Sequence, residues 1–361
     1  MQLMIVDSYV KKKALQTYCG SDWHIVVSLG RICDLPIDRL GVNLDDFKPD
    51  YKLLYGAIPF IKSLNELASC AEQVWLAMDV SREGEILAQH LAEHLIAKSV
   101  KRIVLTDISK EGVTNALNNP KEISQYLCDA WSARRVIDRL IGYKVSQALT
   151  QRFQEPVAIG RVQAIVLKLI VKREQSFCAY QQIKNTLHSN NKSKSIPEKS
   201  LDSNFLKRFD EWSLMLALEK ESVLCAKTLI STLNSLQRHG YIAIQNDFFC
   251  FYPTPFGEQL IDLLEDKFKF LDFSYNRDLE NALENLSQGK EHYFYLVNTV
   301  NDELQKGLGL LRDSISLSMT CPRCQSPVKQ LRDQYGYFKV CSRYREGCTG
   351  SKSENTPGDS V

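Results

Sequence analysis

The chain has 361 residues, of which 44% are hydrophobic and 24% are charged, and its formal net charge is +2 at pH 7. This composition is ordinary for a soluble globular protein, and the length suggests two or three domains. The small net charge excludes a globally basic surface, so any binding of nucleic acid must depend on local positive charge.

No targeting or membrane-spanning segment is predicted. The N-terminal apolar run reaches its first charged residue at Asp7 and has no basic residue before it, which excludes a secretory signal. No apolar stretch is long enough to cross a bilayer. Of the eleven cysteines only the last four have a ligand-like spacing, and this pattern fits a reducing cytoplasm with one metal site better than a disulfide scaffold.

Residues 1–118 are predicted to form an α/β domain. Three short apolar runs are typical of buried strands: 3–6, 74–78 and 102–105. Two segments have helical periodicity: 11–18 and 86–97. Strands that alternate with helices imply a parallel sheet.

Acidic side chains follow two of these strands. Asp79, Ser81 and Glu83 alternate directly after the strand at 74–78, so they can face one cleft, and Asp7 ends the first strand. Carboxylates at neighbouring ends of parallel strands are a natural Mg²⁺ site, because this ion prefers oxygen ligands. The same spacing also fits a helix cap followed by a solvated helix start, and the spacing alone does not separate the two.

Residues 119–180 are predicted to be mainly helical. Two segments have helical periodicity, 128–149 and 162–177, and a loop containing proline and glycine separates them. Arg135 and Arg139 are four residues apart and therefore share one helix face. Arg161 lies at a helix start, where backbone N–H groups favour phosphate. These basic residues fit either a DNA-binding face or an ordinary solvated surface.

Residues 206–318 are predicted to form a second, largely helical region, which a polar linker at 181–205 connects to the first. Two helices are expected, at 212–220 and 226–238. Gly240 is a candidate C-cap for the second helix, and a hairpin turning at 246–247 follows it. Two helices and a hairpin in this order resemble a winged-helix unit.

Residues 319–350 contain two close cysteine pairs, Cys321 with Cys324 and Cys341 with Cys348, joined by a sixteen-residue spacer. Four thiolates at this spacing are typical of a closed tetrahedral Zn²⁺ site, and four free cysteines are the alternative. A module of this size has too little core to fold without a cross-link. Aromatic and basic residues interleave in it, which suits either stacking on unpaired bases or packing of the module itself.

These motifs, in this order, resemble those of the type IA DNA topoisomerases, and the resemblance covers about 1–178 and 206–350. The segment 77–85 has the sequence Ala-Met-Asp-Val-Ser-Arg-Glu-Gly-Glu and is similar to the Toprim signature of that family. Five further segments resemble family motifs: 4–8, 28–36, 133–144, 159–163 and 252–258.

The resemblance implies both the fold class and the domain order. The fold is an α/β Toprim domain with a parallel sheet, followed by a mainly α, winged-helix-containing DNA-binding domain and a small zinc ribbon. The expected ranges are the Toprim domain at 1–118, the first part of the DNA-binding domain at 119–180, a linker in place of the gate domains at 181–205, the second part at 206–318, the ribbon at 319–350 and a disordered tail at 351–361.

The resemblance also implies the site residues. The catalytic cluster would be Asp7, Asp79 and Glu83, of which Asp79 and Glu83 would hold Mg²⁺. The residues expected to bind DNA, preferentially single-stranded, are Lys11, Arg134, Arg135, Asp138, Arg139, Arg161 and Gln163. Structural Zn²⁺ would be bound by Cys321, Cys324, Cys341 and Cys348.

Several departures from the family pattern bear on activity. Ser81 stands where the family has a second aspartate, and Asp7 replaces a glutamate, so magnesium binding and acid catalysis are both expected to be weakened. Ala158 replaces a serine, which removes one expected phosphate contact. No segment of the chain resembles the family's Tyr-x-Arg-Thr-Asp-Ser sequence, which carries the tyrosine nucleophile.

We therefore expect a topoisomerase-like protein that binds single-stranded DNA without independent strand passage. The alternative is an active DNA topoisomerase, an isomerase that alters supercoiling, with or without a partner chain that completes it. A Toprim nuclease or the remnant of a decayed gene is a weaker third possibility.

Overall fold

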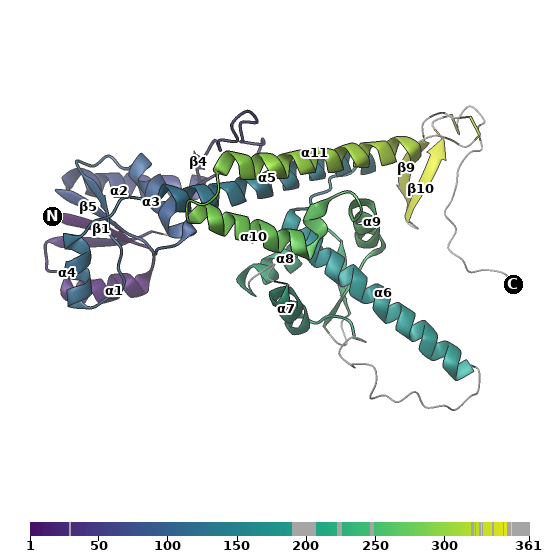
Figure 1. The fold of residues 1–361 in the computed structure, drawn as a ribbon, viewed down its shortest axis with the longest axis horizontal. Helices are drawn as coiled ribbons and strands as arrows, with labels where there is room; N and C mark the ends of the chain where they lie inside the picture. Colours follow the sequence, from purple (N-terminus) through teal and green to yellow (C-terminus); the bar gives the residue numbers. More distant parts are fainter. Residues whose placement is uncertain are drawn as a thin grey trace. The chain divides into compact units, whose positions relative to one another are not determined.

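A computed structural model describes most of the chain, and Figure 1 shows its fold. The described residues are 1–28, 30–189, 207–221, 226–245, 249–318, 321, 323–324, 326, 328–333, 336–341, 343–344 and 348. Most of the expected linker, the hairpin turn at 246–247 and the tail at 351–361 lie outside them. The chain divides into two compact units: Met1–Leu140 with Asp278–Asn301, and Ile141–Arg277 with Asp302–Val361.

The first unit contains a four-stranded parallel sheet, which confirms the predicted α/β class. The strands are β1 (Gln2–Val6), β2 (Trp23–Val27), β5 (Gln73–Ala77) and β6 (Val100–Arg102), in the order β2-β1-β5-β6. Strands β1 and β5 are central and almost wholly buried, as their continuous apolar runs predict.

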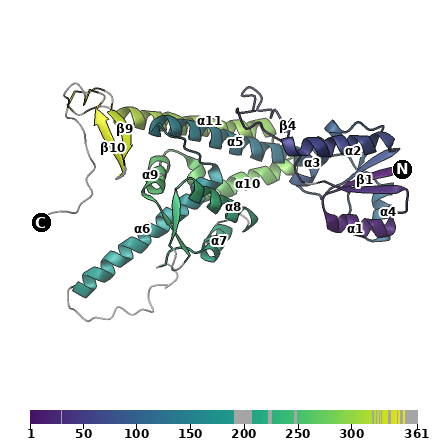
Figure 2. The ribbon, with the colours of Figure 1, turned by 180° about the vertical axis from the view of Figure 1, so that it is seen from behind.

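Helices cover both faces of this sheet, as the two opposite views in Figures 1 and 2 show. Leu3 and Ile5 pack on the face covered by α2 (Ile58–Cys70) and α3 (Arg82–His94). Met4 and Val6 point to the other face because successive side chains of a strand alternate. That face is covered by α1 (Tyr9–Tyr18) and α4 (Lys110–Asn118).

Two details of this sheet differ from the sequence-based prediction. Strand β2 was not predicted, and its exposed His24 interrupts the apolar run from which a strand is inferred. Strand β6 lies at Val100–Arg102 instead of 102–105. The shorter elements of the unit are β3 (Cys33–Asp34), β4 (Lys52–Leu53) and η1 (Tyr55–Ala57).

Three long helices contribute residues to both units: α5 (Gln125–Phe153), α10 (Phe273–Ser287) and α11 (Tyr293–Ser318). The first unit therefore extends beyond the α/β domain expected at 1–118, because the beginning of α5 and the segment Asp278–Asn301 pack with it. Among the described residues no helix is both long and apolar enough to span a membrane.

The second unit is mainly helical. Its further helices are α6 (Arg161–Ser189), α7 (Glu211–Lys220), α8 (Ala226–Arg238), α9 (Pro255–Leu264) and η3 (Lys269–Leu271). The hairpin strands β7 (Ile242–Gln245) and β8 (Cys250–Pro253) pair antiparallel directly after α8. Gly240 has φ +71°, as expected for a left-handed residue that follows a helix.

Helix α6 is longer than predicted. It continues to Ser189, whereas helical periodicity was assigned only to 177 and the linker was expected from 181. The physical reason is that no proline or glycine occurs between Arg161 and Ser189 to end the helix. The C-terminal module contains the antiparallel strands β9 (Val328–Asp333) and β10 (Gly336–Cys341).

Candidate functional site

The predicted acidic residues meet at one edge of the parallel sheet. Val6 of β1 is in register with Ala77 of β5, so the segments that follow both strands leave the sheet side by side. The backbone N–H of Asp79 donates a hydrogen bond to Asp7 Oδ2 at 2.7 Å. Asp7 is mostly buried, and the Asp79 side chain is 67% exposed.

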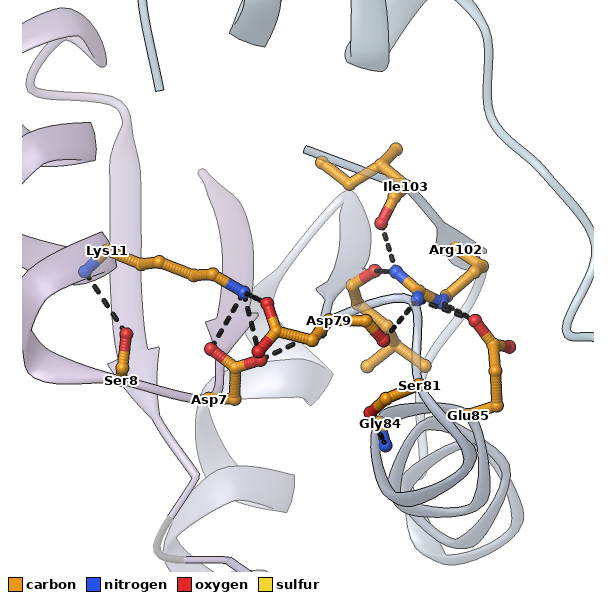
Figure 3. A network of polar contacts seen from close by, with 10 residues as sticks. Asp7, Ser8, Lys11, Asp79, Ser81, Gly84, Glu85, Arg102 and Ile103 are labelled. Carbon is orange, nitrogen blue, oxygen red and sulfur yellow. Dashed lines mark hydrogen bonds and ion pairs between the residues drawn. The ribbon is translucent and has the colours of Figure 1, made fainter. Parts of the chain in front are cut away.

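Lys11 joins these two carboxylates (Figure 3). It lies in the first turn of α1, where its backbone N–H donates to the side chain of the N-cap residue, Ser8. Its ammonium nitrogen is 2.9 Å from Asp7 Oδ2, and it also forms an ion pair with Asp79 Oδ1. Lys11, which was predicted to contact DNA, thus offsets one of the two negative charges of the cluster in this conformation.

Ser81 and Glu83 do not converge on the same point. Ser81 is the N-cap of α3, and its hydroxyl accepts a hydrogen bond from the backbone N–H of Gly84 at 3.0 Å. Glu83 is exposed on the first turn of α3. A Cβ atom at Gly84 would lie 2.1 Å from the carbonyl oxygen of Asp79, so only glycine permits this close approach of helix and turn.

This donor set does not fit a magnesium ion. Mg²⁺ requires several oxygen ligands in near-octahedral geometry. The ammonium group of Lys11 already lies between Asp7 and Asp79, and the Ser81 hydroxyl caps a helix.

A buried ion pair that the sequence analysis did not single out supports the cluster. Glu85 Oε1 lies 2.6 Å from Arg102 Nη2, and both side chains are almost fully buried. Arg102 also donates to the carbonyl oxygen of Asp79 at 3.2 Å, and Glu85 accepts from the backbone N–H of Ser124 at 3.1 Å. The pair thus fixes the turn that carries Asp79. The signal for it was Arg102 itself, a charged residue at the start of the apolar run predicted as a buried strand at 102–105.

Two pairs of arginines each share one carboxylate within the first unit. In the first pair, Arg31 Nη1 and Arg135 Nε each lie 2.7 Å from a different oxygen of Asp34. Arg31 also lies over the ring of Trp131, 5.8 Å from its centroid. Burial would raise the pKa of Asp34, but the hydrogen bond from Arg135 and the charges of both arginines outweigh it and hold that pKa below its ordinary value.

In the second pair, Arg82 and Arg134 share Glu280 of α10. Arg134 Nη1 lies 3.0 Å from Glu280 Oε2, and Arg82 Nη1 lies 3.9 Å from the same oxygen. Arg82 also contacts Glu284 one helical turn later, at 2.6 Å. Both arginines therefore face carboxylates in the absence of DNA.

The other residues of α5 predicted to bind DNA contact the protein itself or are partly buried. Arg139 donates to the carbonyl oxygens of Leu35, Pro36 and Arg39 and so anchors the loop that carries them. Asp138 is half-buried beside it on α5.

Two predicted DNA-binding residues belong to the second unit. Arg161 is 3% exposed and donates to Asn276 Oδ1 at 2.8 Å. Gln163 accepts from the backbone N–H of Gly160 at 2.9 Å and donates to Ser235 at 2.8 Å. A contact between DNA and Arg161 would require the bond to Asn276 to open, so the roles of both residues stay predictions.

The four cysteines of the C-terminal module come together as predicted. The sulfurs of Cys321, Cys324, Cys341 and Cys348 all lie within 4.8 Å of one another, an arrangement that can hold one metal ion. Hydrogen bonds from the hydroxyl and backbone N–H of Ser326 lower the pKa of Cys324 to about 6, whereas burial raises the pKa of Cys341 to about 12. The proximity of the four sulfurs, and not their pKa values, therefore supports a metal site.

Most of the aromatic and basic residues of this module, including Tyr335 and Arg345, lie outside the described residues or have side chains outside them. Tyr344 is described and is 57% exposed. The proposal that the module stacks on bases therefore stays a prediction.

Comparisons with known proteins agree with this arrangement. The Toprim domain family matches residues 2–108, and the family described as DNA topoisomerase matches residues 122–205. The curated DNA topoisomerase 1 of Campylobacter jejuni is 37% identical over 182 residues, which make up 49% of this chain and 26% of that protein. The chain thus spans about a quarter of the length of this curated relative.

A solved structure has the same fold. Full-length topoisomerase I from Thermotoga maritima matches with a TM-score of 0.69 over 94% of this chain and 96% of that chain, at 18% sequence identity. This likeness concerns the fold alone. The two matched families and the curated relative, with the shared fold, support a type IA topoisomerase-like protein.

Proposed function

We propose that this protein binds single-stranded DNA through the two arginine pairs of its first unit, Arg31 with Arg135 and Arg82 with Arg134. The observation that carries the proposal is that each pair converges on a single carboxylate, Asp34 or Glu280. Guanidinium groups bind carboxylates and phosphates with the same geometry. A DNA phosphate can therefore occupy the position that each carboxylate now holds.

Exposure of these side chains supports the proposal. The side chains of Arg31 and Arg134 are 47% and 41% exposed, so an incoming strand can reach them without unfolding the unit. Arg135 is more buried and held by Asp34, and its role is to fix the direction of Arg31 through their shared carboxylate. The preference for unpaired DNA rests on the likeness to type IA topoisomerases.

The binding test is fluorescence anisotropy with a labelled single-stranded oligonucleotide and with the matching duplex. Replacing Arg31 and Arg134 together by glutamine should weaken binding to the single strand at every sequence. The salt dependence should also flatten by roughly 0.7 per phosphate contact that is lost. Arg39→Gln is the matched control, because Arg39 also pairs with a carboxylate, Asp50, but lies outside both pairs. Unchanged affinity and salt slope in the double variant would place the DNA elsewhere.

We also propose that the protein alone does not pass DNA strands. The chain has no segment that resembles the one carrying the tyrosine nucleophile. The Asp7–Lys11–Asp79 cluster, which would assist that nucleophile, is bridged by its own lysine, which offsets one of its two negative charges. Relaxation of supercoiled DNA by the purified protein would instead favour an active topoisomerase.

For the C-terminal module we propose structural zinc. Four thiolates in a closed set are typical ligands of this ion, and the mutual distances of the four sulfurs support one tetrahedral site. Elemental analysis of freshly purified protein should find one zinc per chain, and its absence would reject the proposal. We propose a cytoplasmic location, which suits the cysteines of the described residues, none of which is paired in a disulfide.

A further inference from the structure

We infer that Lys11 is a built-in cation that takes the place of a divalent metal at the acidic cluster of the Toprim domain. The inference starts from the contacts of its ammonium group. This group bonds to carboxylates from two different strand ends, Asp7 after β1 and Asp79 after β5 (Figure 3). It thus performs the task that a metal would perform there, which is to hold two like charges together.

The position of Lys11 is fixed by local structure. The Ser8 cap starts α1 next to β1, and Lys11 follows Asp7 by four residues, so their side chains lie on the same side of the helix start. The Lys11 side chain is only 13% exposed and that of Asp7 only 20%. A lysine held in this way loses little further freedom when it pairs with the carboxylates, and solvent screens its pair with Asp7 more weakly than its pair with Asp79, whose side chain is 67% exposed.

The remaining oxygens leave little room for a second cation. Asp7 Oδ1 is buried without a hydrogen-bond partner, but it lies 2.9 Å from the ammonium nitrogen of Lys11. One oxygen of Asp7 accepts from the backbone N–H of Asp79, and the hydroxyl of Ser81 accepts from Gly84. A divalent ion at Asp79 would also approach the positive charge of Lys11. Ser81, which stands where an aspartate is expected, carries no charge, and Lys11 offsets the charge of the carboxylates that it bridges. Both features reduce the negative charge that would attract a divalent metal ion.

The inference concerns the metal alone and does not depend on DNA binding. Binding of Mn²⁺, a spectroscopic substitute for Mg²⁺, can be titrated by electron paramagnetic resonance on the full-length, zinc-loaded protein. Wild-type protein and the Asp79→Asn variant should bind Mn²⁺ equally weakly. Lys11→Met should gain one site that binds at least about tenfold more tightly, and adding Asp79→Asn to it should remove that site.

Lys13→Met is the matched control, because Lys13 is an exposed lysine on the same helix and its loss should leave Mn²⁺ binding unchanged. Two results would overturn the inference: a wild-type site that Asp79→Asn removes, or a folded Lys11→Met protein without any gain. If Lys11→Met does not fold, as judged by circular dichroism, the comparison of wild type with Asp79→Asn still decides the question.

Discussion

His90 is buried between aromatic rings and has no hydrogen-bond partner for either ring nitrogen. Its ring lies 4.9 Å from Tyr51 and 6.3 Å from Trp131 between centroids. Burial lowers the pKa of His90 to about 4, although the nearby Glu93 opposes this shift. The neighbouring charges of His94, Asp34 and Arg31 contribute less. Folding therefore requires His90 to be neutral.

This burial predicts a loss of stability in acid. Between about pH 6.5 and about pH 4 the unfolded chain binds a proton that the folded chain excludes, so the free energy of unfolding falls as pH falls through this window. The expected loss is about 3 kcal/mol. Urea unfolding followed by tryptophan fluorescence can measure it. His90→Leu should flatten the pH dependence, whereas replacing the exposed His24 in the same way should leave it intact.

The buried Glu85–Arg102 pair predicts a second effect at a single residue. Glu85→Gln leaves the guanidinium of Arg102 buried without a counter-charge, which should lower the free energy of unfolding by about 3 to 5 kcal/mol. Glu83→Gln is the control on the same helix turn, because Glu83 is exposed and its neutralisation should cost under about 0.5 kcal/mol. Equal losses in the two variants would show that the burial of the Glu85–Arg102 pair does not increase its effect on the free energy of unfolding.

Single residues also show the limit of sequence-based inference at the site. Lys11 and Asp7 are four residues apart, so their pairing could be expected from a helix start. The contact between Lys11 and Asp79 joins residues 68 positions apart, and it exists only because β1 and β5 are neighbours in the sheet. Its consequence, a lysine that bridges both carboxylates, could not be predicted without the fold.

Helix α10 determines what the second arginine pair contacts. Glu280 and Glu284 lie one turn apart on it and face Arg82 and Arg134. If these carboxylates stand in for phosphates, they compete with DNA. Glu280→Gln should therefore strengthen the binding of single-stranded DNA, by up to about fivefold for one exposed charge pair.

The same anisotropy assay measures this change, and Asp278→Asn provides the control. Asp278 is exposed on α10, and its substitution removes the same charge. If both substitutions strengthen binding equally, the gain reflects general charge and not competition at the arginine pair. A weaker affinity for the Glu280 variant would contradict the proposed position of the phosphate.

We expect the stability of the C-terminal module, which contains the antiparallel strands β9 and β10, to depend on metal binding by its four cysteines. Among the described side chains of this module, the buried cluster consists of the four cysteines. Cys341→Ser should abolish stoichiometric zinc and expose this module to proteolysis, while the parallel sheet of the first unit keeps its melting transition. Zinc content and limited digestion measure the two effects. Retention of one zinc per chain by the variant would reject Cys341 as a ligand.

Elements differ in how well the sequence predicts them. Strands β1 and β5 are continuous apolar runs, and they were located almost to the residue. Helix α6 was predicted too short because the polar composition of its last turns was taken for a linker. The segment of α10 and α11 that packs with the first unit was not predicted, because packing between distant segments leaves no periodic signal in either one.

For the molecule as a whole, the order of motifs predicted the α/β Toprim domain, the helical region and the cysteine module correctly. The partners of the arginines were not predicted, because Arg134 and Glu280 are 146 positions apart. Charged motifs in a sequence indicate which chemistry is available. The fold decides whether that chemistry faces a ligand or another side chain of the protein.

The central claim is that the protein binds single-stranded DNA without strand passage, and one measurement tests it most directly. Negatively supercoiled plasmid is incubated with Mg²⁺ and with protein at a concentration that saturates a single-stranded oligonucleotide, and the topoisomers are then resolved by electrophoresis after protein removal. An unchanged distribution is predicted, because loss of a covalent nucleophile alone lowers rates on the order of a millionfold. Magnesium-dependent relaxation that disappears when one tyrosine is changed to phenylalanine would contradict the claim.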